Sequence, residues 1–532
     1  MVLIDGHDSA WQRKFHTVAL AVCRNSENLT DVPRNSTIAV KNNAPKFSVG
    51  EERNQRKIIF MHLNLGHVPW EQLPLQTRDS QEKNHDQPKC RFLAIEVIDC
   101  TALEMGLPYI FKLPLQHLYI STPMILRRSM GRILAKGLQE SNWILQKFQL
   151  SSATFTIPCM DEFARGLVSA SSLQELDFSY CLFQGLETTA NDAQSALVKE
   201  KQIHSTEACM TSLAAGVSQS SIFCLKLNRC QLRDTAVANL ILHGLSHNGN
   251  LQELFLGGNH LNKEALSALG QYLGFPLGCS LVTLELSNVV REGPDFILNN
   301  SNEPLQAQLA ALQDNTTREN VLSCIYPALV VNKSLRVLHL SSNGLKDNDV
   351  HSLCLAISQS QLSMLDLKSN DITDYGAKIL ADHLPPKLER LWLLGNPVGV
   401  TGATALKKTL ERTHVNLIDL RIPIYQNFEL IPELEKLQQE CYYFSLLNQG
   451  GRRILLDEER DNDCHNNKIL DSKNPIPLKL PLGLWALILA RVNRVEFVVP
   501  WGQPTAAQSP EANRVEVLYY LLKNTSMLRQ HR

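Results

Sequence analysis

The sequence lacks the features that would place it among membrane, secreted or nucleic-acid-binding proteins. Its longest apolar stretch, residues 478–490, is interrupted by Lys479 and Pro481 and is shorter than the roughly 18–20 residues that cross a bilayer. The N-terminal region shows no long apolar run of the signal-peptide type. The charges balance, with 52 Lys+Arg against 53 Asp+Glu and a formal net charge of -1. We therefore expect a soluble chain in the cytoplasm, with the nucleus as an alternative, and neither nucleic acid nor membrane as its partner.

Motifs for metal binding and catalysis are also missing. The 13 cysteines include no C-x-x-C pair, which argues against a disulfide framework or a zinc site and favours a reducing compartment. The 16 histidines are dispersed, and the sequence contains no phosphate-binding G-x-x-x-x-G-K-[ST] loop, H-E-x-x-H, G-x-S-x-G or EF-hand loop. These absences predict a protein that is not an enzyme and needs no cofactor or metal ion.

What the sequence does contain is a repeat. The pattern L-x-x-L-x-L-x-x-N/C-x-L recurs, and most copies follow one another at intervals of 23 to 30 residues. Cysteine replaces the asparagine at positions 100, 181 and 230. A poorly formed twelfth copy lies around Phe60, Leu63 and Leu65. The eleven clearer copies start at Phe92, Leu115, Leu145, Leu173, Ile222, Leu251, Leu281, Leu335, Leu362, Leu388 and Leu417.

Each part of the repeat has a physical role. The alternating leucines point to one side of a short strand, because side chains of a strand alternate between its faces. The asparagine can bond to backbone groups where the chain leaves the strand. Apolar residues at i, i+3, i+4 and i+7, as in Val350, Leu353, Cys354 and Ile357, then predict a helix. One strand and one helix per repeat bury their leucines against each other.

The turns into the helices carry a family resemblance. Residues 343–350 (NGLKDNDV) and 370–377 (NDITDYGA) are similar to the N-x-[IL]-x-[DS]-x-G-[AV] turn of ribonuclease-inhibitor-like leucine-rich-repeat proteins, whose repeats also contain a full helix. The resemblance spans roughly residues 60–426. It implies an α/β leucine-rich-repeat solenoid, a horseshoe with inner parallel strands and outer helices. Because a repeat array needs its open end covered, we also expect a C-terminal helical cap, with a separate functional module as the alternative.

Composition divides the chain into three parts. Residues 1–57 are polar and irregular, residues 58–426 carry the array of 11–12 repeats, and residues 427–532 form a helical capping region. Two longer intervals in the array predict insertions at 184–205 and 291–319. In the third part we expect a first helix at 429–447 and later helices at 481–492 and 511–523. The string at 442–448, with Trp485 and residues 518–522, resembles a tail of leucine-rich-repeat proteins from unicellular algae, and this implies lineage but no mechanism.

The strand face is the candidate site. In each copy, the residue between the last two core leucines points away from the core. Phe255 and Trp392 stand out, because large apolar groups on an open face are enriched among interface hot spots. The alternative is contact with a loop or the cap of the same chain, above all for Trp392. The predicted row is Glu96, Tyr119, Gln149, Asp177, Lys226, Phe255, Glu285, His339, Asp366, Trp392 and Arg421.

These observations favour a scaffold or adaptor that holds a partner protein on the concave face of the array. Two alternatives use the same repeat. One is a GTPase-activating protein, which one branch of the subfamily provides, although its diagnostic residues are not matched here. The other is a sensor or regulator that resembles innate-immune leucine-rich-repeat proteins but has lost their nucleotide-binding module. The sequence does not identify the partner.

Overall fold

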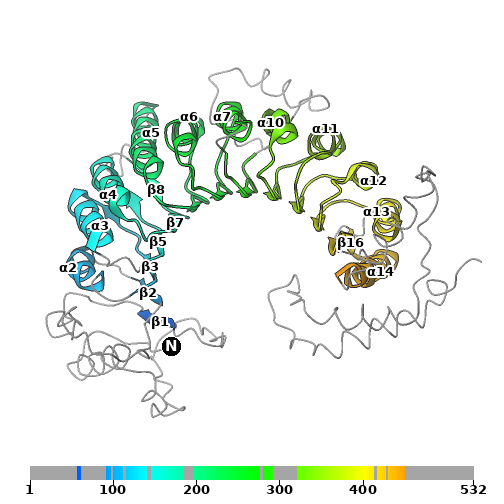
Figure 1. Cartoon of the computed structure of the whole chain (residues 1–532), viewed down its shortest axis with the longest axis horizontal. Coiled ribbons are helices and arrows are strands. Elements are labelled where there is room, and N and C mark those ends of the chain that lie inside the picture. The colour runs from blue at the N-terminus through cyan, green and yellow to red at the C-terminus, as the bar shows by residue number, and fades with distance from the viewer. Residues whose placement is uncertain are drawn as a thin grey trace, which may run out of the picture. The chain divides into compact units, whose positions relative to one another are not determined.

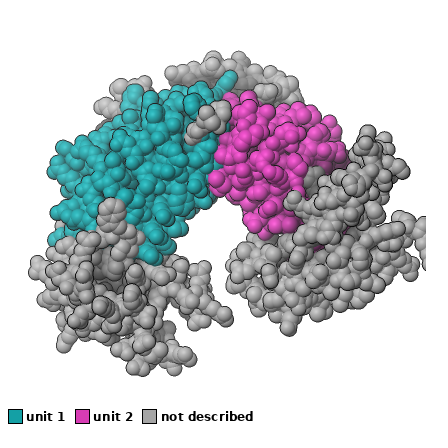
Figure 2. Space-filling model, viewed as in Figure 1, with its two compact units in different colours: residues 1–281 teal, residues 282–532 magenta. Residues whose placement is uncertain are grey.

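The computed structural model describes residues 57–60, 92–96, 100–111, 115–140, 145–184, 196–275, 279–290, 320–412, 416–426 and 429–449. The chain divides into two compact units, residues 1–281 and 282–532 (Figure 2). In each unit the repeat helices pack on one side of a row of parallel strands, and no described repeat helix covers the other side (Figure 1). The α/β class and the leucine-rich-repeat arrangement are thus confirmed in each unit.

Unit 1 holds seven parallel strands of the repeat sheet, each paired with the strand of the next repeat. The strands are β1 (Lys57–Phe60), β2 (Phe92–Glu96), β3 (His117–Ser121), β5 (Lys147–Ser151), β7 (Glu175–Asp177), β9 (Cys224–Lys226) and β10 (Glu253–Phe255). The helices are α2 (Cys100–Ile110), α3 (Arg128–Glu140), α4 (Ile157–Ser169), α5 (Ala196–Ser218), α6 (Asp234–His243) and α7 (Lys263–Leu273), with the 3-10 helix η4 (Leu245–His247). A second parallel sheet joins β4 (Ile125–Leu126), β6 (Thr154–Phe155) and β8 (Leu182–Phe183).

Unit 2 continues the same pattern and ends in a different one. Its repeat strands are β11 (Thr283–Glu285), β12 (Val337–His339), β13 (Met364–Asp366), β14 (Arg390–Trp392) and β15 (Asp419–Arg421). Its helices are α10 (Tyr326–Val331), α11 (Asp347–Ile357), α12 (Asp374–His383), α13 (Val400–Arg412) and α14 (Pro432–Gln449), and the 3-10 helix η5 (Val321–Ile325) precedes α10. An antiparallel pair, β16 (Tyr425–Gln426) and β17 (Glu429–Leu430), leads into α14, which lies against α13 and β15.

The core sits between the strands and the helices, as the leucine pattern predicts. In β10 and β13, the motif leucines Leu254 and Leu365 are fully buried. Unit 1 replaces some leucines with phenylalanines that contact one another across repeats; the ring centroids of Phe155 and Phe178 lie 4.8 Å apart. Burying side chains of this size is the main stabilising contribution of each repeat.

The asparagine position connects consecutive repeats. Asn259 accepts hydrogen bonds at Oδ1 from the backbone N–H groups of Cys230 and Leu232 in the preceding repeat, at 3.0 and 3.1 Å. Its Nδ2 donates to the carbonyls of Leu227 and Leu256, both at 2.7 Å. Asn343, Asn370 and Asn396 make the corresponding contacts. The expected role of this residue is confirmed, and its amide-group contacts reach back into the previous repeat.

Cysteines at the same position replace the donor half of the asparagine amide, because their thiols also bond to carbonyls of the preceding repeat. The Sγ of Cys181 donates to the carbonyl of Leu150 at 3.1 Å, and the Sγ of Cys230 donates to that of Phe178 at 3.1 Å. Burial raises the pKa of Cys181 to about 12, so this thiol stays neutral at physiological pH and is a poor nucleophile. These cysteines therefore act as small buried groups that bond to the neighbouring repeat.

The glycine in the turn into the helix makes room for the preceding repeat. Asp374 Oδ1 accepts from the backbone N–H groups of Gly399 and Gly402 at 2.7 and 2.8 Å. A Cβ on Gly402 would lie 2.7 Å from that Oδ1 atom. Asp347 reaches Thr373 in the same way, and a Cβ on Gly376 would collide with it. A side chain at this position would displace the aspartate that caps the next helix.

The structure corrects four predicted boundaries, two of them at repeat strands. The first clear copy is out of phase by two residues, because Leu93 pairs with Leu118 and Ile95 with Ile120. Cys100 consequently opens helix α2 and does not occupy the asparagine position. In the twelfth copy, the strand is β1 (Lys57–Phe60), which ends at the first of the three residues named from the sequence.

The other two corrections concern helices. The predicted insertion at 184–205 is partly helical, because residues 196–205 begin the 23-residue helix α5. The helix predicted at 429–447 begins at Pro432, where a proline fits the first turn, and β17 occupies Glu429–Leu430. The insertion at 291–319, residues 1–56 and the helices expected at 481–492 and 511–523 lie outside the described residues.

Candidate functional site

The row of outward strand residues forms as predicted, with one exception. Strand pairing places Tyr119, Gln149, Asp177, Lys226 and Phe255 side by side in unit 1. In unit 2 it places Glu285, His339, Asp366, Trp392 and Arg421 side by side. The exception is Glu96, which pairs with Ser121; the residue opposite Tyr119 is Ala94.

The residues of this row differ in how far their side chains are exposed to solvent. Asp177 and Asp366 are only 8% and 3% exposed. Each accepts the backbone N–H two residues later, Ser179 at 2.8 Å and Lys368 at 3.0 Å, and Glu285 receives Ser287 N–H in the same way at 3.0 Å. These carboxylates fix the chain where it leaves its strand. Asp177 and Asp366 therefore offer little surface of their own, and their contact with a partner stays a prediction.

In unit 1, charged residues on three neighbouring strands contact one another, and an aromatic ring on a fourth strand joins them. Glu175 of β7 bonds to Lys147 of β5 at 2.6 Å and to Lys226 of β9 at 2.5 Å. Burial opposes ionisation of Glu175, but the hydrogen bonds from the two lysines outweigh it and hold the pKa of Glu175 below its usual value. The Nζ of Lys226 also lies 5.3 Å from the ring centroid of Phe255 on β10. Phe255 is half-buried, and its ring is held by a cation from the neighbouring strand.

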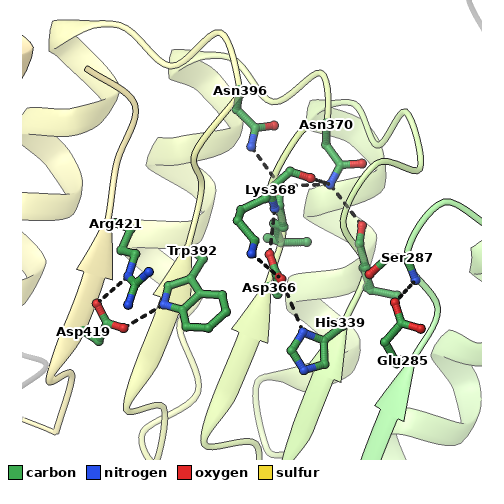
Figure 3. Close-up of polar contacts among 12 residues, drawn as sticks. Glu285, Ser287, His339, Asp366, Lys368, Asn370, Trp392, Asn396, Asp419 and Arg421 are labelled. Atoms are coloured by element: carbon green, nitrogen blue, oxygen red, sulfur yellow. Dashed lines mark hydrogen bonds and ion pairs between the residues drawn. The ribbon is translucent and has the colours of Figure 1, made fainter. Parts of the chain in front are cut away.

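In unit 2, Trp392 lies between two cations (Figure 3). The Nζ of Lys368 and the Cζ of Arg421 are each 4.6 Å from the indole ring. The indole Nε1 donates to Asp419 Oδ2 at 2.8 Å, and Arg421 Nε bonds to Asp419 Oδ1 at 3.0 Å. Tryptophan is the preferred partner in such cation–π contacts, so this side chain is held in one orientation while remaining partly exposed.

Asp366 extends this cluster to the next strand. It bonds to His339 Nδ1 at 3.3 Å and to Lys368 Nζ at 3.2 Å. Burial opposes its ionisation, but the hydrogen bonds from His339 and Lys368 keep the pKa of Asp366 below its usual value. The carboxylate in turn anchors the lysine that covers Trp392. Sequence reasoning missed Lys368, Asp419 and Glu175, although each lies two residues from a predicted residue and so shares its strand face.

The expectation that the C-terminal region covers Trp392 finds no support among the described contacts. These come from His339 on β12, Lys368 in the turn after β13, and Asp419 and Arg421 on β15. Within the described ranges, no group of three or more His, Cys, Asp or Glu side chains could hold a metal ion. None of the described helices has the length and apolar character needed to cross a membrane.

Known proteins share this repeat. A family model described as "Leucine Rich repeat" matches residues 331–354 and 362–381. The chain is 27% identical over 325 residues to ribonuclease inhibitor of Mus musculus, covering 58% of this chain and 71% of the relative. It is 26% identical over 345 residues to ribonuclease inhibitor of Sus scrofa, covering 61% and 75%.

A third relative is a larger protein. The chain is 26% identical over 313 residues to the Homo sapiens protein named "NACHT, LRR and PYD domains-containing protein 14", covering 49% of this chain and 27% of that protein. The likeness to leucine-rich-repeat proteins of unicellular algae stays an expectation. Repeat motif, strand pairing and these relatives together show that the chain is a ribonuclease-inhibitor-like leucine-rich-repeat protein.

Proposed function

We propose that the chain is a non-catalytic scaffold that binds a partner protein on its strand face, with Trp392 as the main contact of unit 2. The observation that carries the proposal is the fixed, partly exposed indole between Lys368 and Arg421. An aromatic side chain that is already held in one rotamer loses little entropy on binding. Tryptophan and arginine are also the residues most enriched among interface hot spots.

Phe255 is the corresponding anchor in unit 1. It lies in register with Lys226, and Lys226 is itself held by Glu175. The remaining row residues, Tyr119 among them, surround these anchors with polar groups; the hydroxyl of Tyr119 hydrogen-bonds to Ser151 at 3.0 Å. An apolar centre with a polar rim is the usual anatomy of a protein interface.

The relatives make a protein partner a reasonable choice. The mouse and pig proteins are named ribonuclease inhibitors, so a ribonuclease is one specific candidate, and titration of the purified chain into a ribonuclease assay tests it. The GTPase-activating and sensor alternatives stay predictions, because no contact among the described residues favours either of them.

The decisive experiment compares partners recovered from the native cell by three full-length proteins: wild type, Trp392→Ala and Tyr375→Ala. Tyr375 is a matched control, because it is also an exposed aromatic, at 63%, but it lies on helix α12. We expect a protein that wild type and Tyr375→Ala retain and that Trp392→Ala loses. With the purified partner, Trp392→Ala should weaken binding by about 1–3 kcal/mol. Equal recovery by all three proteins would refute the strand-face assignment.

A further inference from the structure

One backbone position of the repeat takes the left-handed conformation, and two of its occupants are unusual. The position comes immediately before the asparagine position of the motif, which cysteine, alanine or valine fills in some repeats. Glycine and asparagine adopt this conformation at low cost, and serine is small, whereas large side chains are disfavoured there. Six of the eight occupants are serine, asparagine or glycine, but Tyr180 and Arg229 are large. The occupants with positive φ are Ser152, Tyr180, Arg229, Gly258, Asn288, Ser342, Ser369 and Gly395.

The repeat itself imposes this conformation. Tyr180 N–H donates to the carbonyl of Asn228, and Arg229 N–H donates to that of Gly257, both at 2.8 Å. Corresponding bonds hold Ser342 and Ser369, so a serine satisfies the backbone requirement fully. The size of Tyr180 and Arg229 therefore adds nothing that the fold needs at this position. Strained residues of this kind point to a role outside folding.

The two large side chains contact each other across neighbouring repeats of unit 1. The guanidinium Cζ of Arg229 lies 5.6 Å from the ring centroid of Tyr180, which is 55% exposed. On its other flank Arg229 lies against Gly258, where a Cβ would come within 2.5 Å of Arg229 Cγ. The arginine is thus held between an aromatic ring and bare backbone, and its side chain remains exposed.

Within unit 1, Arg229 differs from the lysines of the strand face in its charge balance. Lys147 and Lys226 are both paired with Glu175. For Arg229, no carboxylate lies within ion-pair distance in the described part of the chain. A guanidinium that is oriented by stacking and has its N–H donors unpaired matches the two oxygens of a carboxylate.

We infer that Tyr180 and Arg229 form a second contact site, at the C-terminal ends of β7 and β9, that receives a carboxylate side chain from an acidic segment of a partner protein. The inference rests on the proposed protein-binding function and names the chemistry that this part of unit 1 recognises. A nucleic acid fits less well, because phosphate backbones need several aligned cations.

The test uses the full chain and a fluorescein-labelled peptide in which Glu-Gly-Ser-Leu is repeated three times, followed by anisotropy at low salt. The variants are Arg229→Ser and Tyr180→Ser, which introduce the residue found at positions 152, 342 and 369. Arg233→Ser is the matched control, because Arg233 is an exposed arginine of the same repeat that makes no side-chain capping bond. We expect Arg229→Ser to weaken binding by about tenfold or more and Tyr180→Ser by a few-fold, with Arg233→Ser within about twofold of wild type.

Thermal unfolding of the same proteins separates binding from folding, and the serine variants should melt at or above the wild-type temperature. A peptide with Gln in place of Glu should not bind. The inference is overturned if the Glu peptide does not bind, if Arg229→Ser binds it as well as wild type, or if Arg233→Ser loses as much. It is also overturned if oligouridine binds more tightly than the peptide in an Arg229-dependent way. The assay involves neither Trp392 nor the native partner, so its failure would leave the proposed strand-face function standing.

Discussion

Replacing Asn370 with alanine tests how much the asparagine bonds stabilise the array. Asn370 Oδ1 accepts from Asn343 N–H and Leu345 N–H at 2.9 and 3.1 Å, and its Nδ2 donates to the carbonyls of Leu340 and Leu367 at 3.1 and 2.9 Å. The Leu367 carbonyl keeps a second donor in Asn396. The substitution therefore deprives two N–H groups and one carbonyl of their partner, and each buried unsatisfied group costs about 1–3 kcal/mol. With some water entering the turn, we expect Asn370→Ala to lower the free energy of unfolding by about 3–5 kcal/mol.

Urea unfolding measures the loss, and amide hydrogen exchange locates it at Asn343 and Leu345. Asn348→Ala, at an exposed position of α11, is the control and should stay within about 0.5 kcal/mol of wild type. Asn370→Cys should fall between the two, because Cys230 shows that a thiol at this position still donates to a carbonyl. If Asn370→Ala unfolds like wild type and both amides keep their protection, the side-chain bonds do not hold the turns.

Three further outcomes follow from the structure. Phe255→Ala should change the melting temperature little, whereas Leu365→Ala in the core should cost about 2–5 kcal/mol in urea unfolding; equal losses would make Phe255 a core residue. Because the pKa of Asp366 is lowered by folding, its contribution to stability is present above the unfolded value of about 4 and is lost as pH falls through the folded value. Asp366→Asn should therefore flatten the acid limb of a plot of unfolding free energy against pH, and an unchanged limb contradicts this. A chain ending at Arg421 should aggregate or lose exchange protection from β15 inward, because α14 no longer covers that repeat; a monomer as stable as the full chain would show that the C-terminal region is no cap.

The architecture could be predicted from sequence because each repeat shows the same pattern again. A single copy does not fix the register of its strand, since alternating apolar residues fit a strand in several registers. The misplacement of Glu96 shows the limit: Phe92, Ile95 and Val97 satisfy the motif as well as the correct phase, which has Leu93 and Ile95 as its paired leucine positions. A shift of two residues keeps the same face outward. Only pairing with the neighbouring strand decides between the two phases.

The site could be predicted in position but not in detail. The motif placed Phe255 and Trp392 correctly in their row. It gave no indication that Asp366 is buried or that Lys368 and Arg421 enclose the indole, because these contacts depend on side-chain rotamers across strands. Reading positions two residues before and after each row residue would have found Glu175, Lys368 and Asp419.

The direction of the asparagine contacts, from each repeat back to the preceding one, implies an order in which the repeats can complete their backbone hydrogen bonds. Where the motif carries its asparagine, that side chain completes the turn of the preceding repeat, as Asn259 completes the turn at Cys230. Synthesis proceeds from the N-terminus. At such a turn, the backbone N–H groups of the newest repeat therefore gain their hydrogen-bond partner only when the next repeat has been made. After the last strand, the successor is α14: Gln438 accepts from Ile422 N–H at 2.8 Å, and Asn448 donates to the carbonyl of Leu417 at 2.8 Å. We therefore expect β15 to fold late, after the chain has left the ribosome well past residue 448.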